Sequence, residues 1–462
     1  MSWGQLAIWK SIRWLGEEAQ YFNLPRVLPI VPGHSTDEVV AAVGVLVGRH
    51  EALRTTFVPA GRATLQQPHL QGTLVVRRLD AEPGRGRSAA EQLSAELAGV
   101  AFDHAKDWPI RCGIVLENGR PTHVAFAFSH LSLDLWAVRL VERELLQLLE
   151  GDVLPPPTWT PVDQAEFEAG GKGAARGARS LDYWRRTLRS VPAPLFRDPE
   201  PSASPERFVR LGMESAAAAV AATCLAERCG AGTGTVLLAA TAAVLAAYTG
   251  RDSAVLRLIS ANRNDERTRG MVGSMAENAL FVLDVSTGDF DDAVRRSFTA
   301  ATTAYRFAQY DPLALDSIIA ECQDERASGP DLSAFFNDAR LRDRWDDLPV
   351  TDGSVEALRR LVPRTEVTFV GAWERQDATF FVHATYASHA CLLFLMADTA
   401  VIPRPSIETL LRAIETMLVE SAAAPVELAR AAETVGIVPS RNRPAAPSAD
   451  PVSDLPRPGG SA

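Results

Sequence analysis

The sequence has few cysteines, and they are not arranged to build a scaffold. Five cysteines are scattered over 462 residues, an odd number without a CxxC pair. Disulfide frameworks and zinc sites need cysteine or histidine ligands at characteristic spacings. We therefore expect free, mostly buried thiols and no metal site. The cysteines are Cys112, Cys224, Cys229, Cys322 and Cys391.

The sequence also lacks an excess of positive charge, a secretion signal and a long apolar run. With 47 basic and 57 acidic side chains, the formal charge is −10, which argues against a nucleic-acid partner. Lys10 and Arg13 interrupt the apolar N-terminus, as they would not in a signal peptide. The longest apolar run, residues 236–248, has 13 residues, fewer than the roughly 18 needed to cross a bilayer. We expect a cytoplasmic protein with no membrane partner.

The patterns that are present are typical of a globular protein with more than one core. The chain is 47% hydrophobic and 23% charged, and its length fits about three domains of roughly 150 residues or two larger ones. Helical spacing of apolar residues begins at Thr36 and returns at 135–149 and 216–248. Strand patterns stand at 122–128 and 254–260. The sequence thus predicts an α/β (α+β) fold.

The loop between the strand at 122–128 and the helix at 135–149 is the first candidate site, because α/β folds keep their chemistry in such loops. It contains His130 and Asp134 in an HxxxD pattern. One interpretation is a surface pair of side chains one helical turn apart. The other is that His130, with an unperturbed pKa of about 6.5, takes or holds a proton while an amine or hydroxyl attacks an acyl carbonyl. Asp134 would then serve the fold rather than the proton.

Further motifs accompany this loop in a fixed order between residues 2 and 285. They read SWGQLAIW, RHEALRTTF, SHLSLDLW, LDYWRRTL, YTGRDSAVL followed by SANRN, and VGSMAENALFV. The series resembles the condensation domains of nonribosomal peptide synthetases. The patterns of that family are roughly SxxQxxxW, RHExLRTxF, HHxxxDG, YWxxxL, YTGxxDxxxGxxxxxR and GxFxNxLPLR. From residue 285 to about 420 the resemblance is weaker.

The resemblance implies two chloramphenicol-acetyltransferase-like lobes arranged in a V, with the HxxxD loop in a central tunnel. It implies that His130 is the catalytic residue. For His130 to accept or hold a proton, its Nε2 should face the tunnel and its other ring nitrogen should be fixed by a backbone carbonyl. Asp134 is expected to form a buried or half-buried ion pair with Arg263 that ties the loop to the second lobe. The expected division is an N-terminal lobe at 1–195, a linker at 196–207, a C-terminal lobe at 208–435 and a disordered proline-rich tail at 436–462.

The sequence departs from the family pattern at several positions. Ser129 stands where the family has its first histidine, a position that packs and hydrogen-bonds rather than transferring protons. Leu135 replaces a glycine that lets backbone approach the acyl group, so it could narrow the tunnel. Asn278 lies one position later than the asparagine of the last motif. Together with Trp136, Leu135 and Asn278 are candidates to line the tunnel or contact substrate.

The resemblance implies a condensation enzyme of natural-product biosynthesis, which we expect to be freestanding and monomeric. It would transfer an acyl or aminoacyl group from a carrier-protein thioester to a small amine or a second carrier-bound acceptor, forming an amide. No cofactor is expected, because the thioester on the carrier's phosphopantetheine arm is already activated. The sequence contains neither an adenylation signature nor a carrier-type serine motif. Three alternatives stay open: ester formation, a coenzyme A donor, or a non-catalytic module that binds a carrier protein.

Overall fold

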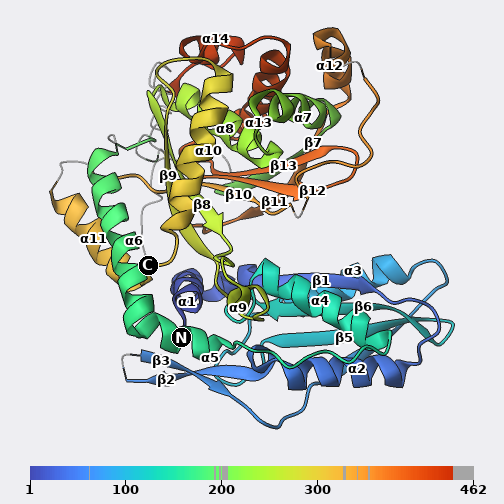
Figure 1. Cartoon of the computed structure of the whole chain (residues 1–462). Helices are drawn as coiled ribbons and strands as arrows, with labels where there is room; N and C mark the ends of the chain where they lie inside the picture. The colour runs from blue at the N-terminus through green and yellow to red at the C-terminus, as the bar shows by residue number, and fades with distance from the viewer. Residues whose placement is uncertain are drawn as a thin grey trace, which may run out of the picture.

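The computed structural model describes residues 1–440 with seven short gaps. The chain forms two lobes that meet at one side and part at the other, as the two arms of a V (Figure 1). The predicted linker at 196–207 falls largely, and the predicted tail at 436–462 mostly, outside the described residues. The gaps are 62, 192–193, 197–198, 200–205, 326–328, 341 and 352–353.

The N-terminal lobe contains a four-stranded sheet in the order β1-β6-β5-β4. Strand β4 is parallel to β5, and the other neighbours are antiparallel. Helices α2 and α4 share a core with one face of the sheet, and α3 packs on the other face. The strands are β1 (Asn23–Pro29), β4 (Val76–Ala81), β5 (Ile110–Glu117) and β6 (Arg120–Ser129), the helices are α2 (Thr36–Arg49), α3 (Gly86–Ala98) and α4 (Leu135–Leu149), and β2 (Thr55–Ala60) and β3 (Ala63–Pro68) form a separate hairpin.

The helix boundaries in this lobe follow from capping. Helix α4 has the bounds that the apolar spacing predicts. Helix α2 is capped by Ser35 rather than by Thr36, because the Ser35 hydroxyl accepts a hydrogen bond from the amide of Glu38. The Glu38 carboxylate accepts one from the Ser35 amide in return.

The C-terminal lobe contains a seven-stranded sheet in the order β11-β7-β13-β12-β10-β8-β9. Figure 1 shows helices α7, α8 and α13 on the side of this sheet that is turned away from the N-terminal lobe. The strands are β7 (Phe208–Ser215), β8 (Ser253–Ser260), β9 (Glu277–Asp284), β10 (Ala334–Asp338), β11 (Glu366–Trp373), β12 (Phe380–Tyr386) and β13 (Cys391–Asp398), and the helices are α7 (Ala216–Cys229), α8 (Thr233–Thr249), α10 (Phe290–Arg306), α12 (Val355–Leu361), α13 (Arg404–Ala423) and α14 (Ala431–Thr434).

The centre of the larger core is helix α8, whose apolar residues are almost all buried. The preceding helix α7 ends at Gly230, whose φ of 64° lies in the left-handed region that glycine adopts at low cost. The helical range predicted at 216–248 is therefore confirmed, and it is divided into two helices. No single helix in the described part of the chain is long and apolar enough to span a membrane. Helices α7 and α8 reach that length only together, and they are bent by 105°.

The remaining helices connect the two lobes, and the packing moves two predicted boundaries. Trp184 and Leu188 of α6 belong to the core of the C-terminal lobe, so the packing changes before residue 195, where the N-terminal lobe was expected to end. Ile437, inside the predicted tail, is only 6% exposed in the same core, so ordered chain extends past residue 435. These helices are α1 (Trp3–Leu15), α5 (Pro161–Ala169), α6 (Gly171–Ser190), α9 (Glu266–Arg269) and α11 (Pro312–Asp324).

Candidate active site

The HxxxD segment forms the turn between β6, which ends at Ser129, and α4, which begins at Leu135. Asp134 is the N-cap of α4, and its Oδ1 accepts a hydrogen bond of 2.9 Å from the amide of Ala137. An aspartate at this position satisfies an amide that has no partner within the helix. The same residue that starts the helix therefore fixes the end of the loop.

The expected ion pair between Asp134 and Arg263 is present and almost completely buried. Arg263 Nη2 lies 2.9 Å from Oδ1 and 2.8 Å from Oδ2 of Asp134, and the two side chains are 2% and 3% exposed. The amide of Met275 donates a further hydrogen bond of 2.9 Å to Oδ2. The buried carboxylate is thus satisfied by its partners, as a buried ion requires, whereas Nε of Arg263 is enclosed without a partner among the described residues.

Arg263 also binds the backbone of the C-terminal lobe. Its Nη1 donates to the carbonyls of Thr268 and Met271 at 2.7 and 2.8 Å, and its Nη2 donates to the carbonyl of Gly273 at 2.7 Å. Asn262, directly before it, has a φ of 54°, and its side chain donates to two backbone carbonyls of the same lobe. This network joins the HxxxD loop to the segment between β8 and β9.

His130 occupies the middle of the turn beside Phe22. Its amide donates to the carbonyl of Phe22 at 2.9 Å, and the two rings meet edge to face at 6.1 Å. Nδ1 is enclosed and makes no regular hydrogen bond to a described residue, so the expected bond to a backbone carbonyl is not formed with ordinary geometry. Nε2 is not enclosed. It is therefore the ring nitrogen that a substrate can reach.

Burial is the main reason why the pKa of His130 lies below its usual value. The carbonyl groups of His130 and Leu133 and the charge of Asp134 act in the opposite direction. A lowered histidine pKa keeps the imidazole neutral near pH 7, with one nitrogen able to accept a proton.

Ser129 is buried next to a histidine that the sequence analysis did not single out. Its Oγ lies 2.8 Å from Nε2 of His104 and accepts a hydrogen bond from the amide of Leu131. Burial lowers the pKa of His104 to about 4, so this imidazole is neutral. His104 lies outside the HxxxD loop and supports it through Ser129. No local pattern in the sequence predicts this contact.

The three predicted tunnel residues lie at different places. Leu135 is partly buried at the start of α4, whereas Trp136 is 38% exposed and donates from Nε1 to the carbonyl of Arg269. Asn278 is partly buried in β9, where its carbonyl accepts a hydrogen bond from the hydroxyl of Tyr310. Trp136 thus contacts α9 at the surface, and the lining of one tunnel by all three residues stays a prediction.

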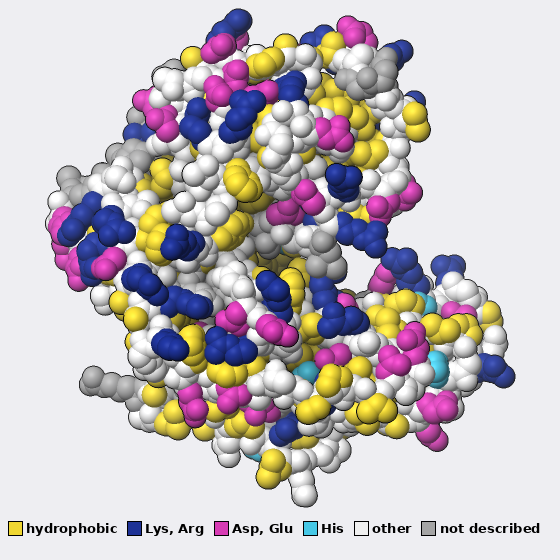
Figure 2. All heavy atoms as spheres, in the orientation of Figure 1, with side chains coloured by type: hydrophobic (Ala, Val, Ile, Leu, Met, Phe, Trp, Pro, Cys, Tyr) yellow, Lys and Arg dark blue, Asp and Glu magenta, His cyan; other side chains and the backbone are white. Residues whose placement is uncertain are grey.

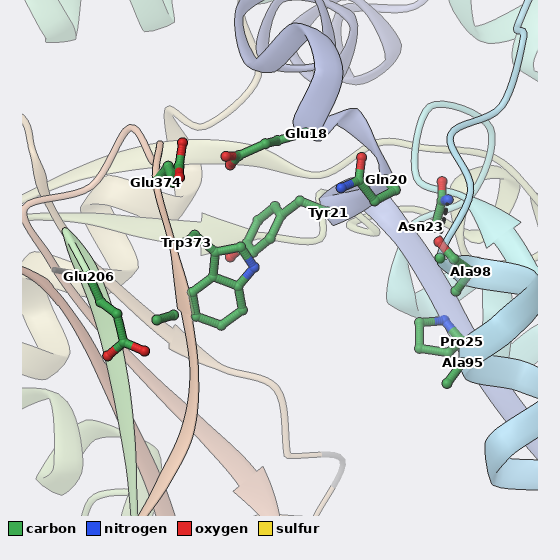
Figure 3. Close-up of a pocket in the computed structure, with 12 residues that line it drawn as sticks. Glu18, Gln20, Tyr21, Asn23, Pro25, Ala95, Ala98, Glu206, Trp373 and Glu374 are labelled. Carbon is green, nitrogen blue, oxygen red and sulfur yellow. Dashed lines mark hydrogen bonds between the residues drawn. The ribbon is translucent and has the colours of Figure 1, made fainter.

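A cavity of about 890 Å³ opens between the lobes. None of the predicted site residues lines it, although its wall includes Asn23, which pairs with Ser129 in the sheet. Figure 3 shows Tyr21 of the N-terminal lobe beside Trp373 of the C-terminal lobe, with rings 5.7 Å apart. The Tyr21 hydroxyl accepts a hydrogen bond of 2.9 Å from Arg210. The hollow between the lobes is visible in Figure 2.

Comparisons with known proteins agree with this architecture. A family model described as Condensation domain matches residues 11–332. A phosphinothricin tripeptide synthetase from Streptomyces viridochromogenes is 26% identical over 387 residues, which are 78% of this chain and 35% of that protein. The chain thus spans about a third of that relative.

Two solved structures share the fold. The condensation domain that mediates chain release from the enacyloxin polyketide synthase has a TM-score of 0.70 at 19% identity, covering 90% of this chain and 82% of its own. The X-domain from teicoplanin biosynthesis has a TM-score of 0.69 at 17% identity, covering 93% and 96%. At these identities the likeness concerns the fold.

Proposed function

Because this chain belongs to the condensation-domain family, we propose that it transfers an acyl or aminoacyl group from a carrier-protein thioester to an amine, forming an amide. The observation that carries the proposal is the state of His130: a neutral imidazole with an accessible Nε2, on a loop that Asp134 and Arg263 hold rigidly. Preorganised groups of this kind accelerate acyl transfer by orientation and proton transfer.

In the proposed step the acceptor nitrogen attacks the thioester carbonyl carbon, and the carbon–sulfur bond breaks. His130 Nε2 takes the proton that the nitrogen must lose, and the departing sulfur finally receives one proton as a thiol. Asp134 does not transfer a proton, because both its oxygens are occupied by Arg263 and backbone amides. Its role is to position the loop.

The thioester supplies the activation, so the proposed reaction uses no resident cofactor. The donor is carried on the phosphopantetheine arm of an acyl or peptidyl carrier protein. The sequence contains no carrier-type serine motif, so the proposed partners are carrier domains outside these 462 residues, with a small amine or a second carrier-bound acceptor.

Substitution of His130 by glutamine tests this proposal. Glutamine keeps a hydrogen-bonding group but cannot titrate, so base catalysis predicts a loss of about 10²–10⁴-fold in single-turnover rate. For the unsubstituted protein, the rate should fall as the pH drops through a pKa below 6.5. The matched control is His123→Gln, which changes another histidine of β6 and should leave the rate unchanged. A His130→Gln variant with an almost unchanged rate contradicts the role as base.

A non-catalytic recruitment module is the second candidate. One solved structure with the same fold is the complex of the X-domain and OxyB from teicoplanin biosynthesis, with a TM-score of 0.66. If this chain only recruits partners, His130→Gln should leave both carrier binding and product formation intact. Loss of product with carrier binding retained favours the enzyme.

The same assay separates the two chemical alternatives. One structure of this fold, the starter condensation domain of rhizomide synthetase, is a complex with C8-CoA. Replacing the carrier-bound donor by the corresponding coenzyme A thioester tests the donor, and replacing the acceptor amine by the matching alcohol tests ester formation.

A further inference from the structure

Arg257 is a partly buried arginine without a polar partner. No described hydrogen bond or ion pair involves its guanidinium, whose Nε is enclosed. The two terminal nitrogens are not enclosed, so they reach accessible space. The guanidinium lies over the ring of Phe335, 4.0 Å from the ring centre. Stacking therefore holds the cation in place while its hydrogen-bond donors stay unused.

The position of Arg257 in β8 determines on which face of the sheet its side chain lies. Its neighbours Leu256 and Leu258 are fully buried in the core beneath the helices. Because successive side chains of a strand point to opposite faces, Arg257 lies on the other face. Figure 1 shows that this face of the sheet is turned toward the N-terminal lobe.

Aromatic side chains continue from Phe335 across this face. Successive ring centres are 5.5, 6.2 and 6.3 Å apart along the row Phe335, Phe381, His383 and Phe394. Each of the last three is partly buried, and burial lowers the pKa of His383 to about 4, so that ring is uncharged. We call these four residues the aromatic row. It is a largely apolar, partly buried face with Arg257 at one end, and the charge of Arg210 acts on His383 within it.

The residue type at position 257 is itself informative. The motif pattern YTGxxDxxxGxxxxxR places its arginine at Arg263 and its glycine six residues earlier, which is the position of Arg257. A long side chain therefore enters space that a glycine would leave free. A partly desolvated guanidinium without an ion pair lowers stability. Burial lowers the pKa of Arg257, whereas the charge of Asp377, followed by three further acidic groups, acts in the opposite direction without forming a described ion pair.

We propose that Arg257 binds a carboxylate group of the small substrate, whose apolar or aromatic part lies along the aromatic row. This inference rests on the proposed function and adds a substrate class to it. The carboxylate is a second acid group, distinct from the thioester carbonyl that reacts. A single guanidinium matches the single charge and two oxygens of a carboxylate. A phosphate carries nearly two charges, and the other cation near the row, Arg210, is already bonded to the Tyr21 hydroxyl and lies over the ring of Trp373.

Ligand binding without turnover tests the assignment. The probes are phenylacetate and its neutral counterpart phenylacetamide, each titrated while the melting temperature is recorded. For the unsubstituted protein, phenylacetate should bind at least tenfold more tightly than the amide. Arg257→Met should remove this preference and Arg257→Lys should weaken it. The matched control is Arg306→Met, because Arg306 is an exposed arginine beside Phe307, 5.8 Å from the ring centre, on α10.

Phosphopantetheine and dephosphorylated pantetheine form the second pair of probes. Similar affinities of the two probes, unchanged by Arg257→Met, support the carboxylate assignment. A preference for phosphopantetheine that Arg257→Met abolishes overturns it in favour of the carrier arm. The assignment is also overturned if the acid and the amide bind equally, or if Arg257→Met, shown to be folded by its melting curve, keeps the preference. These binding measurements do not depend on condensation activity. A failure of the carboxylate assignment can therefore be distinguished from a failure of the proposed function.

Discussion

Arg263 and Arg257 stand six residues apart, yet the protein treats their charges in opposite ways. Arg263 binds a carboxylate and three backbone carbonyls across the meeting point of the lobes. Among the described residues, the guanidinium of Arg257 has the face of Phe335 as its contact and no hydrogen bond or ion pair. The terminal nitrogens of the first guanidinium are bonded within the protein, whereas those of the second remain available to a ligand. Burial alone therefore does not show what a cation does in a protein. Its hydrogen-bond and ion-pair partners show it.

The largest effect on stability is expected when Arg263, the paired cation, is removed. Arg263→Met leaves the Asp134 carboxylate buried without its counter-ion, and such changes cost about 3–5 kcal/mol. Urea denaturation measures the change in the free energy of unfolding. Adding Asp134→Asn should recover part of the loss, because the unpaired charge is then gone. A loss below about 1 kcal/mol for the single variant would contradict the structural role of the pair.

A titration extends the comparison to the aromatic row. Burial, followed by the charge of Arg210, lowers the pKa of His383 from its usual value of 6.5 to about 4. Between these values the unfolded chain binds a proton that the folded protein does not, so stability falls as the pH drops from 6.5 to about 4. The contribution amounts to about 3 kcal/mol at pH 4. His383→Gln should lose this part of the acid sensitivity in melting curves, and parallel curves for both proteins would exclude it.

A neutral hydrogen bond gives a smaller effect. Ser129→Ala removes the contact with His104 and the acceptor for the amide of Leu131. A net loss of about 1 kcal/mol in unfolding free energy is expected. The sharper readout is the single-turnover rate, which should fall if this contact positions the neighbouring His130. A normal rate in a destabilised variant would limit Ser129 to a role in folding.

The smallest effect on stability is expected for Arg257→Met. No partner is left unpaired, and an unbranched apolar side chain can still contact Phe335, so the free energy of unfolding should change by less than about 1 kcal/mol. The same urea denaturation that is used for Arg263→Met makes the two directly comparable. A loss of 3 kcal/mol or more, as roughly expected for Arg263, would show that Arg257 too has a structural partner.

The sequence predicts those parts of the molecule that local patterns determine. Apolar spacing predicts α4 to the residue, and uniform apolarity predicts the buried α8. The ion pair of Asp134 with Arg263 is predictable only through the family pattern, because 129 residues separate its partners.

Other features depend on contacts that no local pattern encodes. His104 reaches Ser129 across 25 residues from an irregular segment. Arg257 interrupts an apolar strand in the same way as any residue on a solvated face would. The wall of the interlobe cavity combines residues near 20, 98, 206 and 373. Such a surface exists only after the lobes have come together.

The unequal linkage of the lobes has a mechanical consequence. The Asp134–Arg263 network clamps them where they meet, whereas the bond of Arg210 to the Tyr21 hydroxyl is a single contact beside the cavity. If the angle between the lobes changes, the lobes rotate about the buried network, and the hydrogen bond between Arg210 and the Tyr21 hydroxyl breaks first. Opening would then separate Tyr21 from Trp373 while His130 keeps its place, so the cavity can admit bulky groups without disturbing the geometry of the loop.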